Sequence, residues 1–170
     1  AWLKDEKPVA RLLAASWLFF DSGHSETSFA VLNELARTPG ERTRQLASWQ
    51  RRRMQVRSQD VTDSSLAHWD STLMNLEPGL RSGPYFVLGR GYLVRQDFEI
   101  AAATFLKVPL IHDSEHPLSA ECLLEAGRAL TRIGLRGEAA KLYSEILDRY
   151  SYAAVVGEAR AELDQLTATQ

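Results

Sequence analysis

The sequence has few of the residues that disulfide-bonded, zinc-binding or membrane-spanning proteins need. Among its 170 residues only Cys122 is a cysteine, so the chain forms no disulfide within itself and has no cysteine cluster for zinc. The longest mainly apolar stretch, Val9 to Phe20, is interrupted by Arg11 and Ser16. A membrane-spanning helix needs ~18 consecutive apolar residues. We therefore expect no membrane span in this segment.

The sequence also lacks a strong charge of either sign. The formal net charge is -2, with 25% charged and 45% hydrophobic residues, which is ordinary for a globular protein. Nucleic-acid-binding domains are usually strongly basic, so we do not expect nucleic acid as a partner. The chain begins at Ala1 and Trp2, and we expect a processed or truncated segment of a longer protein. The compartment stays open between the cytoplasm and the periplasm or cell envelope.

The sequence motifs of common enzymes are missing as well. There is no G-x-S-x-G, no P-loop and no glycine-rich dinucleotide fingerprint. A nucleophile and a base can be paired on paper from Ser119 or Cys122 with His116, but a cysteine on the buried side of a helix is usually inert. We expect no enzymatic activity, no catalytic residue and no cofactor.

One short stretch concentrates metal-ligand residues. It runs His112-Asp113-Ser114-Glu115-His116 and lies in a predicted loop before Pro117. A helix would be needed to bring both imidazoles to one face, as in zinc-binding helices. We therefore favour a polar loop between repeats and expect no metal site.

The main positive feature of the sequence is an internal repeat. Two segments, 85–105 and 123–143, align without a gap. The equivalent pairs, each 38 residues apart, are Gly89 and Gly127, Ala101 and Ala139, and Phe105 and Tyr143. Small residues on two antiparallel helices allow a close backbone approach, and the aromatic residues fill the space around that contact. Because one such helix pair cannot bury its apolar face alone, the pairs must stack.

These positions resemble the tetratricopeptide repeat (TPR), and the spacing is similar to repeats in bacterial envelope proteins of the Tol–Pal coordinator and outer-membrane assembly lipoprotein type. The matching residues are Tyr85, Leu88, Gly89, Tyr92, Ala101 and Phe105, followed by Leu123, Gly127, Leu130, Ala139 and Tyr143. The N-terminal half matches more weakly, with Ser28 and Ala67 at the small second-helix position. The resemblance implies an all-α fold, a right-handed α–α superhelix of about four helix pairs.

We expect a single repeat domain over residues 1–170. The predicted repeats are 8–40, 41–79, 82–116 and 117–151, with a capping helix at 152–167. The predicted helices are 8–21, 25–37, 41–57, 62–76, 83–95, 98–110, 117–133, 137–149 and 152–167. Thr62 or Asp63 suits the start of the fourth helix, and Gly134 suits the end of the seventh. No segment alternates strictly between apolar and polar residues, so no strand is predicted.

The resemblance also implies a binding groove, because the residue after the small position of each first helix faces the concave side. The predicted groove residues are Arg90, Arg128, Arg132, Phe86, Leu124 and Trp17. Guanidinium groups pair bidentately with carboxylates, so this set suits an acidic peptide. The alternative is that each arginine pairs with a nearby Glu121 or Glu125.

A second, basic patch consists of Arg51, Arg52 and Arg53 with Trp49 beside them. Such a patch suits phosphate or an acidic protein. However, consecutive residues on a helix point about 100° apart, so three adjacent arginines do not form one stripe. We favour the alternative that the arginine stems cover apolar surface on a solvated helix.

The expected function is therefore a non-enzymatic protein–protein interaction scaffold that binds a protein or peptide in its concave groove. The alternative is a self-association or assembly module that packs through its terminal repeat faces, as a homo-oligomer or as part of a longer repeat protein. The apolar residues Trp2 and Leu3, ahead of the first helix, are assigned to the core, with packing onto an upstream repeat as the alternative.

Overall fold

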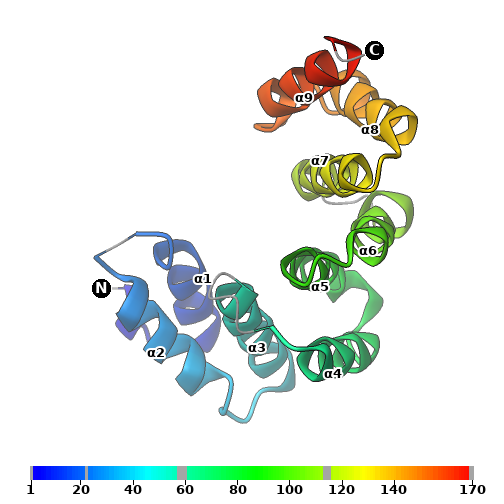
Figure 1. Ribbon diagram of the computed structural model, residues 1–170. Coiled ribbons are helices and arrows are strands. Elements are labelled where there is room, and N and C mark those ends of the chain that lie inside the picture. The colour runs from blue at the N-terminus through cyan, green and yellow to red at the C-terminus, as the bar shows by residue number, and fades with distance from the viewer. Residues whose placement is uncertain (1, 22, 57–60, 113–115, 169–170) are drawn as a thin grey trace. The chain divides into compact units, whose positions relative to one another are not determined.

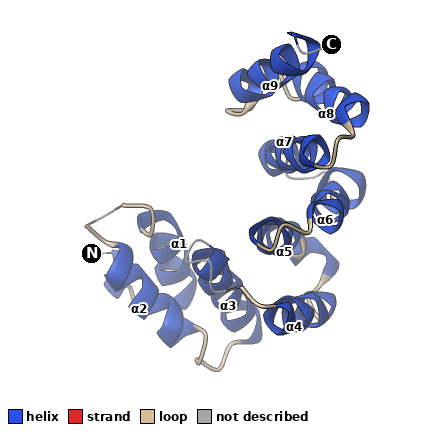
Figure 2. Ribbon diagram, viewed as in Figure 1, coloured by secondary structure: helices blue, strands red, loops and turns tan. Residues whose placement is uncertain are grey.

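The computed structural model describes residues 2–21, 23–56, 61–112 and 116–168. Within these residues the regular secondary structure is helical throughout, with nine α-helices and no strand (Figures 1 and 2). The all-α prediction is confirmed, and each predicted helix is present with ends within four residues of those expected. The chain divides into two compact units, residues 1–60 (unit 1) and 61–170 (unit 2), and each is described by itself.

Unit 1 is built from three α-helices that follow a short 3-10 helix, Trp2–Lys4. They are α1 (Pro8–Leu18), α2 (Ser25–Leu35) and α3 (Glu41–Gln55). Pro8 occupies the first turn of α1, where its missing N–H costs no hydrogen bond. The core is a cluster of small and aliphatic side chains from all three helices: Leu12, Ala15, Val31, Leu32, Leu35, Ala47 and Met54. An ion pair between Arg11 and Glu34, with Nη1 2.9 Å from Oε1, also joins α1 to α2.

Unit 2 contains the other six α-helices, which pack in chain order, each against the next (Figure 1). They are α4 (Asp63–Met74), α5 (Ser82–Val94), α6 (Phe98–Ile111), α7 (His116–Arg132), α8 (Arg136–Arg149) and α9 (Val156–Ala168), with a 3-10 turn at Pro78–Leu80. Thr62 and Ser65 form a reciprocal capping box at the start of α4, as predicted for Thr62. Gly134 ends α7 with a φ of 83°, a conformation that favours glycine.

The repeated glycines make room for aromatic rings. A Cβ atom added at Gly89 would lie 2.7 Å from the Phe105 ring, and one added at Gly127 would lie 2.4 Å from the Tyr143 ring. Both distances are too short for real carbon contacts, so any larger residue would push the ring out of place. The ring in each pair is fully buried. The 38-residue repeat therefore reflects two equivalent helix pairs, α5 with α6 and α7 with α8.

The predicted register of the second repeat was wrong. Ala67, which was assigned to a buried small position, is exposed on α4. The buried residues of α4 are Leu66, Trp69 and Leu73. Leu66 and Trp69 pack against α5 at Gly91, where an added Cβ would lie 2.6 Å from Leu66 Cδ2 and 3.3 Å from the Trp69 ring. The predicted repeat 41–79 also spans the division between the two units.

The last helix, α9, has one buried face and one polar face. Ala159 and Leu166 are buried in the core of unit 2. Glu158, Arg160 and Asp164 are exposed. A helix with this division of residues can close a stack of helices without leaving an apolar surface in water.

Candidate protein-interaction surfaces

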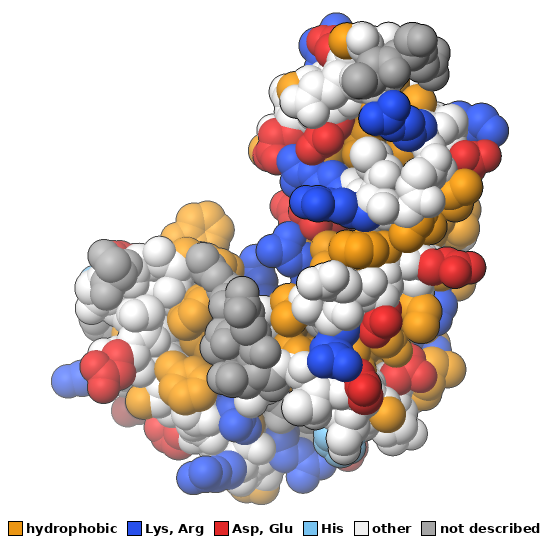
Figure 3. All heavy atoms as spheres, viewed as in Figure 1, with side chains coloured by type: hydrophobic (Ala, Val, Ile, Leu, Met, Phe, Trp, Pro, Cys, Tyr) orange, Lys and Arg blue, Asp and Glu red, His pale blue; other side chains and the backbone are white. Residues whose placement is uncertain are grey.

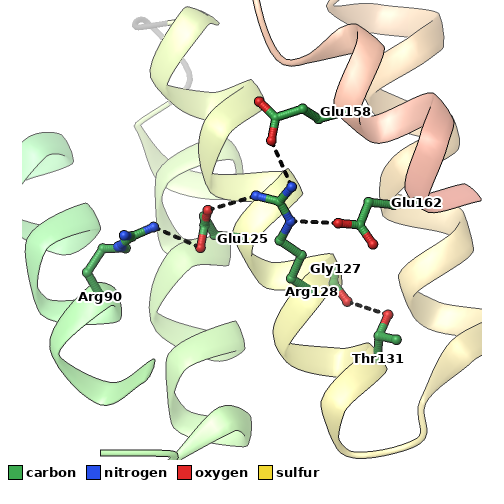
Figure 4. A network of polar contacts seen from close by, with 7 residues as sticks. All are labelled: Arg90, Glu125, Gly127, Arg128, Thr131, Glu158 and Glu162. Atoms are coloured by element: carbon green, nitrogen blue, oxygen red, sulfur yellow. Dashed lines mark hydrogen bonds and ion pairs between the residues drawn. The ribbon is translucent and has the colours of Figure 1, made fainter. Parts of the chain in front are cut away.

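Unit 2 brings two of the three predicted groove arginines, Arg90 and Arg128, onto one surface, where both pair with the same carboxylate. Arg90 on α5 places Nη1 3.2 Å from Glu125 Oε2, and Arg128 on α7 places Nη1 3.3 Å from Glu125 Oε1 (Figure 4). The side chain of Glu125 is only 14% exposed, so its pairing with two cations is screened less than an ion pair on the open surface. Glu125 thus connects α5 to α7.

Arg128 also reaches the last helix. Its Nη2 lies 2.7 Å from Glu158 Oε2 and its Nε lies 2.8 Å from Glu162 Oε1, so all three guanidinium nitrogens have carboxylate partners (Figure 4). Burial lowers the pKa of Arg128, but the hydrogen bonds to Glu162 and Glu158 outweigh burial and raise the pKa above its ordinary value. On the face drawn in Figure 3, acidic and basic side chains adjoin over this end of unit 2.

Arg90 and Arg128 therefore connect helices of their own chain. Two arginines and three glutamates make up the network, so it carries a net negative charge instead of the cationic ladder that an acidic peptide would need. The alternative considered from the sequence, pairing with Glu125, is what the structure shows. Arg132, one turn beyond Arg128, is exposed.

The predicted apolar groove residues of unit 2 are covered. Leu124 is 2% exposed and was wrongly assigned to the open groove. It belongs to the core cluster that also contains Tyr143 of α8 and Ala159 of α9, so it is part of the core of unit 2. Phe86 is half-buried, with its ring 5.7 Å from the ring of Phe105. Leu124 is therefore buried in unit 2 and cannot contact a partner.

Unit 1 differs from unit 2, because its first helix, α1, carries an exposed apolar surface. Trp17, which follows the small Ser16 as Arg128 follows Gly127, is 84% exposed. Two more apolar residues lie on the same side of α1 at four-residue steps, Leu13 at 66% and Val9 at 58% exposed. Phe20, just after the helix, is 53% exposed. We call Val9, Leu13, Trp17 and Phe20 the α1 face.

Trp17 is the one residue of the α1 face that was predicted from the sequence to bind a partner. The sequence did contain a signal for this exposed surface, because α1 has apolar residues on two sides. Leu12 and Ala15 form the buried side, while Val9, Leu13 and Trp17 form the exposed one. A helix that is apolar all round is normally buried all round, and α1 is not. The difference between the two sides appears only once burial is known.

Two hollows adjoin the α1 face. One, of about 720 Å³, lies between α1 and α3 and is lined by Leu13, Ser16, Trp17, Leu18, Phe20, Asp21 and Arg53. The other, of about 600 Å³, is lined by Trp2, Leu13, Ala14, Trp17 and Leu18. Leu13, Trp17 and Leu18 line both hollows. Trp2 is 74% exposed, so its assignment to the core was wrong, whereas Leu3 is half-buried against the core of unit 1.

The basic patch on α3 contributes one residue to this surface. Arg53 stacks on Phe20, with its guanidinium carbon 4.6 Å from the ring centre, and it lines the larger hollow. Trp49 is 3% exposed, so its predicted place on the surface was wrong. The guanidinium carbon of Arg52 lies 4.3 Å from the centre of the Trp49 ring, a contact of the kind expected where arginines cover apolar surface. Burial, together with the charge of neighbouring Arg51, lowers the pKa of Arg52 to about 10.

The groups considered for catalysis and metal binding are only partly described, because residues 113–115 and the side chain of His116 lie outside the description. Burial raises the pKa of the Cys122 thiol far above its ordinary value, which keeps it protonated and unreactive. Ser119 is fully buried. No cluster of three potential metal ligands occurs in the part of the chain that the structure describes, and residues 113–115 lie outside that part. No described helix is long and apolar enough to cross a membrane.

Comparisons with known proteins give no relative for this chain. No protein-family model matches it, and searches of curated proteins and of solved structures found no significant similarity.

Proposed function

We propose that the chain is a non-enzymatic protein-interaction module and that unit 1 binds a segment of another protein on the α1 face. The observation that carries this proposal is Trp17, a tryptophan that is 84% exposed at the centre of an apolar helix face. Exposed, contiguous apolar surface is rare on soluble proteins and usually marks a binding site. Tryptophan is also among the residues that contribute most to binding energy in protein interfaces.

Unit 2 acts as the scaffold in this proposal. Its helix pairs α5–α6 and α7–α8 repeat at 38 residues and pack through Gly89 and Gly127. That repetition supports a right-handed superhelix of the TPR type. The polar outer face of α9 and the ion-pair network around Arg128 give this end of the unit a surface that water solvates well. The proposed recognition therefore belongs to unit 1 rather than to the arginines of unit 2.

Self-association is the second candidate, and the same observation favours it. An exposed apolar helix face can pack against its own copy across a two-fold axis. The two candidates differ in a measurable way, because a homodimer forms without any other protein and depends on the concentration of the chain.

Selection from a displayed library of amphipathic helical peptides tests the proposal. The wild-type chain is used as bait, and the selected peptides are then measured against Leu13→Ser/Trp17→Ser. Because interface energy concentrates in a few central apolar residues, the double variant is expected to bind at least about tenfold more weakly.

A matched control removes two equally exposed apolar side chains from unit 2. Leu110 and Tyr152 are 78% and 69% exposed, and Leu110→Ser/Tyr152→Ser is expected to bind the peptides as the wild type does. Equal binding by all three proteins, or failure to select any peptide, contradicts the proposal. Light scattering of the free chain at increasing concentration separates self-association from partner binding.

A further inference from the structure

We infer that two copies of the free chain pair through their α1 faces about a two-fold axis, and that this dimer closes the proposed binding site until a partner segment displaces it. The inference rests on the proposed function and adds its regulation, because the dimer and the partner compete for one surface. Self-association is then the state in which the free site rests. The area, the shape and the charge of the apolar patch support the pairing.

The exposed apolar area of unit 1 is large enough for a dimer interface. Trp2 lines the smaller hollow together with Leu13 and Trp17, so it extends the α1 face into one continuous patch. Trp2, Trp17 and Phe20 are all more than half exposed. Because an aromatic side chain has about 150–250 Å² of surface, these three residues present roughly 400 Å². With Val9 and Leu13 the patch reaches roughly 600 Å², the upper end for the largest apolar patch on a monomer. Two copies would bury about 1,200 Å², which is enough for a specific interface.

The patch combines protruding side chains with hollows, which suits pairing with an identical surface. Val9, Leu13 and Trp17 follow one another along α1 at steps of about one helical turn. If two α1 helices pack antiparallel with Leu13 at the axis, Trp17 of one copy lies beside Val9 of the other, and symmetry repeats this contact. The hollows of about 720 and 600 Å³ next to Leu13 and Trp17 give the indole rings space to enter. Such a contact covers the whole stripe on both copies.

The charge around the patch is balanced, so two copies meet there without repulsion. Residues 2–24 have three Lys and Arg and three Asp and Glu. The smaller hollow has no charged lining residue, and the larger one has a single arginine and a single aspartate, Arg53 and Asp21. A surface without net charge favours neither an acidic nor a basic occupant, whereas its own copy matches it.

Two of the charges in residues 2–24 also have partners within the chain. Arg11 Nη1 donates to Glu34 Oε1 at 2.9 Å, and Asp21 Oδ2 lies 2.8 Å from His24 Nδ1. The excess positive charge of unit 1 comes from residues 25–60, which have seven Lys and Arg and four Asp and Glu. Five of these arginines are on α3. Added salt screens repulsion between such helices, so it should leave the dimer unchanged or strengthen it.

A head-to-tail contact fits the patch less well than a two-fold contact. Head-to-tail stacking would set the α1 face against the outer face of α9, which exposes Glu158, Arg160 and Asp164. These charged groups would lose water against side chains that offer them no hydrogen bond. Pairing of α1 with α1 covers apolar surface with apolar surface.

Sedimentation velocity of the whole chain, from about 1 to about 500 µM, tests the pairing. We expect a monomer–dimer equilibrium with a micromolar Kd, the weak end for interfaces of standard size. Leu13→Ser/Trp17→Ser is expected to weaken the dimer at least about tenfold, because it removes central apolar contacts. Leu110→Ser/Tyr152→Ser, the matched control in unit 2, is expected to dimerise as the wild type does. Circular dichroism checks that each variant is folded.

Charge complementation tests the two-fold axis itself. Leu13→Arg and Leu13→Glu each place two like charges opposite each other, so each variant alone is expected to be monomeric. An equal mixture is expected to restore a dimer with one chain of each kind, because the charges are then opposite. Native mass spectrometry detects this mixed dimer when one of the chains carries a tag. Position 13 does not meet itself in a head-to-tail contact, so a mixture that stays monomeric overturns the inference.

A helical peptide selected on the wild-type chain separates the inference from the proposed function. The peptide is expected to convert the dimer into monomers that each hold one peptide, and its apparent affinity should fall as the chain concentration rises. A monomeric chain that binds the peptide overturns the inference and leaves the proposed function standing. A dimer that depends on Leu13 and Trp17 but binds no peptide supports the pairing and overturns the proposed function.

Three other results would overturn the inference. The first is a dimer that Leu13→Ser/Trp17→Ser leaves intact, which would assign self-association to another surface. The second is a dimer that keeps its two chains together when the peptide is bound, which would remove the competition. The third is a monomeric chain that binds phosphatidylserine vesicles and loses this binding in Leu13→Ser/Trp17→Ser, which would assign the α1 face to a lipid surface.

Discussion

Positions that the sequence alignment treats as equivalent behave in opposite ways in the two units. In unit 2, Gly127 lies against the Tyr143 ring and Arg128 is bound by three carboxylates. In unit 1, Ser16 is half-buried and Trp17 is 84% exposed. The residues on the first helix of a pair are therefore not groove residues by position alone. Whether they stabilise the fold or remain open to a partner depends on the helices that pack beside them in their own unit.

The largest expected effect on stability is at the small residue Gly127 in α7, which we compare with the small residue Ser16 in α1. Gly127→Ala adds a methyl group that would lie 2.4 Å from a fully buried ring. The overlap is expected to cost about 1–3 kcal/mol, more than the ~1 kcal/mol that alanine gains over glycine in a helix, so the free energy of unfolding should fall. Ser16→Ala in α1 is expected to change the free energy of unfolding by less than about 0.5 kcal/mol. Chemical denaturation followed by circular dichroism measures both.

Gly137→Ala in α8 is the control for the glycine substitution itself, because an added Cβ there has nothing within 4 Å. It is expected to leave the stability unchanged or slightly raised. A Gly127→Ala chain as stable as Gly137→Ala would show that the Tyr143 ring can move aside and that the close packing is not required.

A smaller effect on stability is expected for the residues that follow these two, Arg128 in α7 and Trp17 in α1. Arg128→Ala removes the cation that holds Glu125, Glu158 and Glu162, and leaves these carboxylates to repel one another. The side chain of Arg128 is 35% exposed, so water and salt screen the network and the expected loss is about 1 kcal/mol. Trp17→Ala removes a side chain that packs little, and its effect on stability is expected to stay below about 0.5 kcal/mol.

Salt separates the electrostatic part of the Arg128 effect from a loss of packing. The stability difference between the wild type and Arg128→Ala should shrink as ionic strength rises, because added ions screen both the attraction and the repulsion. An equal difference at low and high salt would assign the loss to packing. A Trp17→Ala chain that unfolds as readily as Arg128→Ala would remove the contrast between the two units.

The helices were predictable because their signals are local. Apolar spacing, Pro8 in the first turn of α1, Thr62 at the start of α4 and Gly134 at the end of α7 all act within one or two turns. The register of α4 was not predictable in this way. Its buried side is decided by Gly91 of the next helix, whose missing side chain admits Leu66 and Trp69.

The surfaces were harder to predict because exposure depends on neighbours distant in the sequence. Leu124 and Leu13 are placed at equivalent positions by the sequence alignment and are both leucines, yet one is 2% and the other 66% exposed. Leu124 belongs to the cluster that includes residues of α9, and this tertiary packing leaves no mark on the sequence around position 124. The pairing of Arg128 with Glu158 and Glu162 also spans 30 and 34 residues of sequence.

Backbone hydrogen exchange with and without a selected helical peptide tests the central claim most directly, because it locates the binding surface without any substitution. We predict slower exchange in α1 (Pro8–Leu18) and α3 (Glu41–Gln55), the helices that line the larger hollow. Exchange in α5 and α7 should stay the same. Protection confined to α5 and α7, around Arg90 and Arg128, would contradict the account and assign partner binding to unit 2.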